Sequence, residues 1–95
     1  MATGYRKKAI PSAVRREVAR RYGAEPGTTI LVPCHYCGVL AKIDWLADYP
    51  NWPILYHELD HVVPEFRGGL TTATNLVLAC TPCNRSKGHK AGGAG

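Results

Sequence analysis

The fold of this chain is decided by residues 56–64, which read Tyr56-His57-Glu58-Leu59-Asp60-His61-Val62-Val63-Pro64. Acidic groups and histidines stand here inside an apolar, β-branched run. Burying such groups is costly unless they are paired or used. Pro53 before the segment and Pro64 after it leave little room for a helix. We therefore expect a strand over residues 54–61 that carries a functional site.

Successive side chains of a strand point to opposite faces. The alternation divides the segment into two sets, with Tyr56, Glu58 and Asp60 on one face and His57, Leu59 and His61 on the other. Twist or a bulge near the end of the strand would still bring Asp60 and His61 to one site. A second short strand, residues 76–79, is expected to pair antiparallel with this one.

Two Cys-x-x-Cys pairs, Cys34/Cys37 and Cys80/Cys83, lie on either side of that segment. Four thiolates at this spacing are the usual ligands of a tetrahedral structural Zn²⁺, which leaves no open position for a substrate. A chain of 95 residues has a thin core, so metal binding would supply folding energy. Two disulfides or four free thiols are the alternatives. A cytoplasmic protein is expected, because no membrane-spanning run or signal-peptide core is evident, and disulfides are rare there.

The remaining elements follow from local signals. A helix is expected from Pro11 or Ser12 to Tyr22, with Gly23 as its left-handed stop and an apolar stripe that contains Val14 and Val18. Strands over residues 30–32 and 39–43 would enclose the first cysteine pair. After Cys80, a short helix running to Lys87 is expected, with Thr81 as its cap and Pro82 as its first residue.

The chain is basic, with a formal net charge of +5, which favours an anionic partner over a cationic one; simple solubility is the alternative. We expect a flexible basic segment over residues 1–9, a single domain over 10–90 and a disordered tail over 91–95. The helix arginines form either a solvated face or a contact with the DNA backbone: Arg15, Arg16, Arg20 and Arg21. Trp45 and Trp52 are expected to cover the core rather than stack on a base.

Read literally, His57-Glu58-Leu59-Asp60-His61 matches the H-E-x-x-H pattern of zinc proteases. That pattern needs a helix, which brings the two histidines together on one face. Here the segment is expected to be a strand, no third ligand is evident, and the chain is short for a peptide cleft. The protease interpretation is therefore disfavoured.

The same residues fit another order of motifs. They read Glu58-Leu59-Asp60-His61-Val62-Val63-Pro64, then Gly68-Gly69, then Asn75-Leu76, then Cys80-x-x-Cys83-Asn84-x-x-Lys87-Gly88. This order resembles the HNH nuclease family over roughly residues 34–88. The resemblance implies an α+β domain with a ββα-metal core: a β-hairpin and a helix that hold one metal ion. In this chain the core would carry the zinc site and the N-terminal helix in addition.

The resemblance also implies roles for the residues. Asp60 and Asn84 would hold the catalytic Mg²⁺ or Mn²⁺, although some family members have histidine in place of Asn84. His61 would be the general base that activates water. Asn75 would bond the backbone across the loop and orient His61. Glu58 would assist either the metal or the fold, and four further side chains are candidates for phosphate contact: His57, Arg67, Arg85 and Lys87.

The expected function is divalent-metal-dependent cleavage of DNA, double-stranded DNA being favoured, with 5′-phosphate and 3′-hydroxyl products by resemblance. A single active site predicts nicking before double-strand cutting. The alternative is a zinc-dependent DNA-binding module that cuts nothing and serves in a larger packaging, repair or recombination assembly. The compact format resembles HNH proteins of phages and bacteria, which is an analogy of fold.

Overall fold

The computed structural model describes residues 10–46 and 53–87 of the chain. The expected flexible segment 1–9, the tail 91–95, Trp52 and the expected helix end at Gly88 lie outside the described residues. The elements follow in the order α1 (Ser12–Arg21), β1 (Thr29–Pro33), β2 (Leu40–Asp44), β3 (Ile54–Leu55), β4 (Glu58–His61), η1 (Glu65–Arg67), η2 (Ala73–Asn75), β5 (Leu76–Ala79) and α2 (Thr81–Lys87). The architecture is a small α+β fold, as expected.

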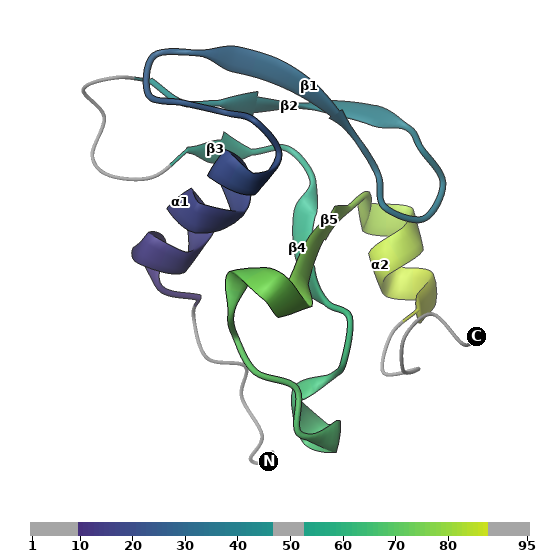
Figure 1. The fold of residues 1–95 in the computed structure, drawn as a ribbon. Coiled ribbons are helices and arrows are strands. Elements are labelled where there is room, and N and C mark those ends of the chain that lie inside the picture. Colours follow the sequence, from purple (N-terminus) through teal and green to yellow (C-terminus); the bar gives the residue numbers. More distant parts are fainter. Residues whose placement is uncertain (1–9, 47–52, 88–95) are drawn as a thin grey trace, which may run out of the picture.

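Two antiparallel sheets build the domain. One contains β1, β2 and β3 in that order, and the other contains β4 and β5. The β1–β2 hairpin extends along one side of the molecule, α1 lies below it, and β4–β5 stands between α1 and α2 (Figure 1). The unit β4–β5–α2 is therefore a hairpin followed by a helix, which confirms the predicted ββα arrangement.

Helix α1 begins and ends close to the predicted residues. Val18 is fully buried, and Val14 and Tyr22 pack against the same core, as the apolar stripe predicted. Gly23 adopts a φ of 101° and lets the chain leave the helix in the left-handed conformation. The hydroxyl of Tyr22 accepts a hydrogen bond of 3.0 Å from the Leu78 amide, so α1 covers the free edge of β5.

The single strand predicted over residues 54–61 is wrong. The chain forms β3, bends at Tyr56 and His57, and continues as β4 in the other sheet. The cause is a long-range contact, because the buried His57 ring places Nε2 3.2 Å from the Val32 carbonyl oxygen and 3.1 Å from that of Val39. Both partners only accept hydrogen bonds, so Nε2 carries the proton. His57 therefore fastens the β1–β2 hairpin to the start of β4.

The β4–β5 pairing is antiparallel, as predicted, and sets Asp60 opposite Val77 and His61 opposite Leu76. The chain between these strands turns at Gly68, which adopts a φ of 91°. At Gly69 a Cβ atom would collide with the Val63 carbonyl oxygen, so only glycine fits there. The backbone turn at these two positions thus requires glycine at both.

The core lies between α1, the β1–β2 hairpin and β5, and its largest fully buried side chains include Ile43, Leu78 and Val18. Trp45 is buried in this cluster and carries the Arg20 guanidinium 5.0 Å above its ring. The packing role expected for Trp45 is confirmed. No helix in the described part of the chain is long and apolar enough to cross a membrane.

Candidate functional site

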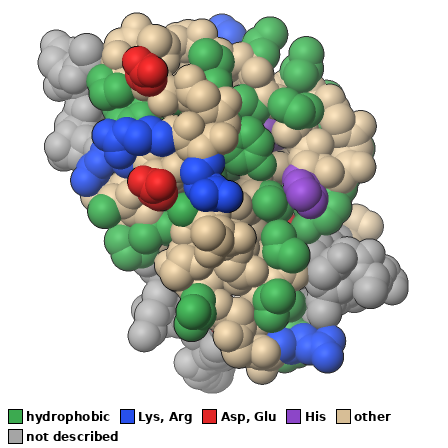
Figure 2. Space-filling view, in the orientation of Figure 1, with side chains coloured by type: hydrophobic (Ala, Val, Ile, Leu, Met, Phe, Trp, Pro, Cys, Tyr) green, Lys and Arg blue, Asp and Glu red, His purple; other side chains and the backbone are tan. Residues whose placement is uncertain are grey.

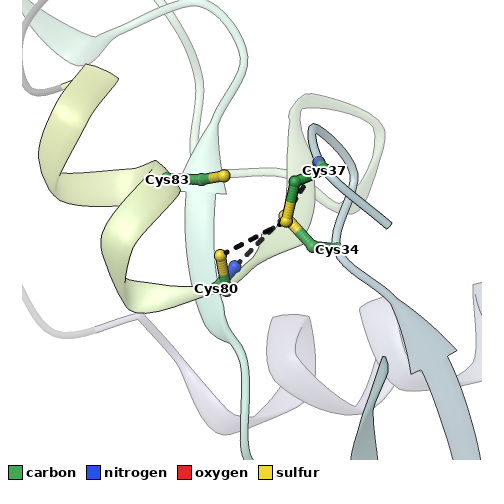
Figure 3. Close-up of side chains that lie close together, drawn as sticks. All are labelled: Cys34, Cys37, Cys80 and Cys83. Carbon is green, nitrogen blue, oxygen red and sulfur yellow. Dashed lines mark hydrogen bonds between the residues drawn. The ribbon is translucent and has the colours of Figure 1, made fainter. Parts of the chain in front are cut away.

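The four cysteines converge on one point, from two elements that are far apart in the sequence. Cys34 and Cys37 come from the turn after β1, and Cys80 and Cys83 from the start of α2 (Figure 3). All four Sγ atoms lie within 4.8 Å of one another. The 3.7 Å between the Sγ atoms of Cys37 and Cys80 matches the spacing of about 3.8 Å that tetrahedral Zn–S bonds impose.

Backbone amides lower the pKa of one thiol in this cluster, whereas neighbouring thiols raise the pKa of another. Burial alone would raise the pKa of the Cys34 thiol, but amide hydrogen bonds from Cys37, Cys80 and Tyr36 outweigh it and lower the pKa to about 5. Contact with the Cys80 and Cys37 thiols raises the pKa of Cys83 to about 12. Four thiolates therefore need a cation between them, and the donor set fits a metal such as zinc.

Asp60 is almost buried, with 6% of its surface exposed, and it needs a partner there. The Tyr36 hydroxyl donates a 2.5 Å hydrogen bond to its Oδ2 atom. Burial and the Asp60 carboxylate both raise the pKa of Tyr36, so the phenol stays protonated and remains a donor. Tyr36 belongs to the first cysteine turn, and this bond links that turn to β4.

Glu58 lies on the same face of β4 as Asp60 and joins the strand to α2. Its Oε1 atom accepts a 2.6 Å hydrogen bond from Asn84 Nδ2, and its Oε2 atom accepts one of 2.9 Å from the Thr81 hydroxyl. A carboxylate only accepts, so the amide nitrogen of Asn84 must face Glu58. The Oδ1 atom of Asn84 therefore points away from Glu58, where it can serve as a ligand.

The prediction that Thr81 caps the helix after Cys80, with Pro82 as its first residue, is wrong by one position. Helix α2 begins at Thr81, and the Asn84 amide donates to the Cys80 carbonyl at 2.9 Å. Cys80 is therefore the residue that precedes the helix, one position earlier than predicted. The Thr81 hydroxyl is used by Glu58 rather than as a cap.

His61 is the last residue of β4 and lies beside two residues that the sequence analysis did not select. Its Nε2 atom lies 2.9 Å from the Thr71 hydroxyl oxygen, and that hydroxyl donates to Glu65 at 3.0 Å. Because the Thr71 hydroxyl donates its single proton to Glu65, it can only accept a hydrogen bond from His61. Nε2 of His61 is then the protonated nitrogen, and Nδ1 is the nitrogen that can take a proton.

Asn75 makes the backbone contacts that were expected of it. Its Nδ2 atom donates to the carbonyl oxygens of Val63, at 3.0 Å, and Leu70, at 2.8 Å, while its Oδ1 atom accepts from the Val63 amide at 2.9 Å. The Val62 amide also donates to the Asn75 carbonyl at 2.9 Å. These bonds hold both ends of the loop that follows His61.

The candidate phosphate contacts differ in accessibility. Arg67 and Arg85 are exposed, and the side chain of Lys87 lies outside the described part of the structure. His57 is buried, and its Nε2 atom donates to two carbonyl oxygens, which contradicts its candidacy as a phosphate contact. It does not reach the surface as a phosphate contact. Lys and Arg side chains appear in separate patches on the face shown in Figure 2, the largest of them beside α1.

Comparison with known proteins shows which family contains this arrangement. The sequence model of the HNH endonuclease family matches residues 34–90, more than half of the chain. The chain belongs to the HNH endonuclease family. The match contains all four cysteines and the whole β4–β5–α2 unit, so the HNH domain here is the ββα fold with the four-cysteine cluster described above. No curated protein and no solved structure was found to match the chain.

Membership in the HNH family implies binding to nucleic acid, and it indicates a nuclease or DNA-binding function. The hydrogen bonds divide the predicted residues of the HNH domain into two groups. Asp60 and Asn84 are bonded to Tyr36 and Glu58, whereas His61 and Asn75 are bonded to residues of the loop that follows β4. Tyr36, Thr71 and Glu65 were missed, because no local spacing marks a contact that only the folded chain creates.

Proposed function

We propose that this HNH domain is a divalent-metal-dependent endonuclease that hydrolyses DNA phosphodiester bonds. The observation that carries the proposal is the orientation of Asn84 by Glu58, with 2.6 Å between Nδ2 and Oε1. A DNA-binding module would not need an amide oxygen held in a fixed direction. The Asp60 carboxylate on the same strand supplies the anionic oxygen that such a site requires.

Two metal ions are proposed, and different donor sets support them. Cys34, Cys37, Cys80 and Cys83 would hold Zn²⁺, because soft thiolates select it over Mg²⁺. Asp60 and Asn84 would hold Mg²⁺ or Mn²⁺, which prefer oxygen ligands and often keep several waters beside one or two protein groups. When bound, this second ion would stabilise negative charge on the phosphate and on the departing 3′ oxygen.

The proposed general base is His61. Its Nε2 proton is engaged by Thr71, so Nδ1 would remove a proton from the attacking water. The water oxygen then forms a bond to phosphorus while the bond to the 3′ oxygen breaks. The departing 3′ oxygen takes a proton from a second water molecule, which leaves 5′-phosphate and 3′-hydroxyl ends. Glu65, 3.9 Å from His61 Nε2, would stabilise the imidazolium formed in this step. Asn75 would fix the loop that carries Thr71 and Glu65.

DNA is the proposed partner, and the net charge of +5 supports an anionic substrate. Arg67 and Arg85 are exposed and are proposed as phosphate contacts, and Lys87 is proposed on its position after Asn84. These contacts carry no sequence information, because phosphate groups are alike at every base pair. A monomer with one such site would nick a duplex before it linearises a plasmid.

The Glu58→Gln variant tests the orientation of Asn84. Glutamine has the same shape, but it offers both an amide and an oxygen, so it no longer dictates which way the Asn84 amide turns. We expect cleavage to fall by about 10- to 100-fold, the usual cost of losing a group that orients a metal ligand. Cleavage of a labelled duplex at saturating Mn²⁺ measures this loss. Glu25→Gln, on an exposed turn, is the matched control and should be unchanged. Equal rates for the two variants would argue against the orienting role.

The proposed activity is tested by the metal dependence of cleavage. Zinc-loaded protein is incubated with a duplex in the presence of Mg²⁺ or Mn²⁺, and again after these ions are removed while the zinc content is monitored. The proposal predicts cleavage only with the added ion, and product ends that a ligase can rejoin. Cleavage that survives removal of the ion would refute the catalytic metal.

The alternative of a non-catalytic DNA-binding module has one observation in its favour, the near-complete burial of Asp60. Such a module could serve in a packaging, repair or recombination assembly. Tight DNA binding without turnover under Mg²⁺, Mn²⁺ or any other divalent ion would favour it over the nuclease.

A further inference from the structure

The hydroxyl of Tyr36 contacts Asp60, while the contact that Tyr36 makes with the cysteine cluster comes from its backbone. The Tyr36 amide already donates to Cys34 Sγ at 3.3 Å, so the backbone of this residue serves the cysteine cluster. Its side chain instead crosses to β4 and bonds Asp60 Oδ2 at 2.5 Å. One residue thus belongs to both proposed metal sites.

The turn that carries Tyr36 is itself fixed to the hairpin that carries Asp60. The His35 amide donates to the Leu78 carbonyl at 2.8 Å, and Leu78 lies on β5 next to Val77, the partner of Asp60. The His35 ring packs edge-on against Tyr36, with 4.9 Å between ring centroids. The phenol therefore approaches Asp60 from an anchored position.

We propose that Tyr36 is a positioning residue for the divalent-metal site: its hydroxyl occupies Asp60 Oδ2 and restricts the carboxylate to binding a metal through one oxygen. The inference rests on the proposed function. Mg²⁺ and Mn²⁺ favour octahedral coordination, in which a carboxylate supplies one oxygen, whereas Ca²⁺ readily accepts both. Tyr36 thereby sets the preference of the site for the smaller ions.

The test compares Mn²⁺ and Ca²⁺ binding to the full-length, zinc-loaded chain without DNA. Mn²⁺ binding is followed by electron paramagnetic resonance, and Ca²⁺ binding by competition with Mn²⁺. Tyr36→Phe removes only the hydroxyl. Tyr56→Phe also removes only a hydroxyl, one that donates to a different carboxylate, Asp44, at 3.2 Å, which makes it the matched control. Zinc content and far-ultraviolet circular dichroism establish that each variant is folded.

The proposal expects the Kd for Mn²⁺ to rise by about tenfold in Tyr36→Phe, with a much smaller change for Ca²⁺. The preference for Mn²⁺ over Ca²⁺ then falls, while Tyr56→Phe binds both ions like the wild type. In the Asp60→Asn background the added effect of Tyr36→Phe should vanish, because the two residues act through one contact.

Three results would overturn the proposal. The first is a Kd for Mn²⁺ in Tyr36→Phe within twofold of the wild type. The second is an equal weakening of both ions, or the same weakening in Tyr56→Phe, because neither result would depend on the contact between Tyr36 and Asp60. The third is a wild type that binds no Mn²⁺, which removes the proposed catalytic metal itself. The first two leave the proposed function standing, so the two failures are distinguishable.

Discussion

Removal of zinc from the cysteine cluster will unfold the chain. The cluster joins the turn after β1 to the start of α2, and most residues of both segments are exposed or half-buried. Structural zinc sites of this kind contribute about 10–16 kcal/mol of apparent binding free energy at neutral pH. That is comparable to the whole stability of about 5–15 kcal/mol that a folded domain possesses. The loss of the ion therefore removes the cooperative thermal transition.

The measurement combines zinc release, followed with a colorimetric chelator, and circular dichroism of the same sample. One zinc ion per chain should leave as the folded signal disappears, and excess Mg²⁺ should not restore it, since thiolates bind Mg²⁺ poorly. Cys83→Ser should have the same effect without a chelator. A zinc-free chain that melts within a few degrees of the zinc-loaded one would refute a structural role for the cluster.

Asp60→Asn will reduce DNA cleavage by about 1000-fold, equivalent to about 4 kcal/mol of transition-state stabilisation. The substitution keeps the shape of the side chain and an oxygen that can accept the Tyr36 hydroxyl, but it removes the negative charge. A hard divalent ion depends on that charge, and the site has one other proposed protein ligand, Asn84. Mn²⁺ binding should weaken in parallel, while the zinc content stays at one ion per chain.

The matched control is Asp44→Asn, which removes a carboxylate that accepts a hydrogen bond of 3.2 Å from Tyr56 on the other sheet. That variant should cleave DNA like the wild type. If both variants lost activity equally, the effect would reflect the fold or the net charge. If Asp60→Asn retained full activity, Asp60 would not be a ligand of the catalytic metal.

The sequence predicted the parts of this molecule that depend on local spacing. The Cys-x-x-Cys pairs indicated a four-thiol cluster, and Gly23 marked the end of α1. In each case a few neighbouring residues specify the geometry. The backbone contacts of Asn75 were implied by the resemblance to the HNH family.

The parts that the sequence did not predict depend on contacts between distant segments. The strand over residues 54–61 is broken because His57 bonds carbonyls of the β1–β2 hairpin, and no periodicity within the segment contains that information. Tyr36 reaches Asp60 because the cysteine turn is anchored to β5. Thr71 contacts His61 because the turn at Gly68 and Gly69 directs the loop back toward the end of β4.

The central claim is that the β4–β5–α2 unit cuts DNA with His61 as its base. Plasmid relaxation tests it most directly, with the wild type and His61→Ala compared at matched zinc content in Mg²⁺ or Mn²⁺. General-base catalysis contributes about 100- to 10,000-fold, so the wild type should convert supercoiled plasmid to the nicked form while the variant leaves it intact over the same time. Plasmid binding by both proteins with cleavage by neither would establish the binding module instead, and equal cleavage by both would show that His61 is not the base.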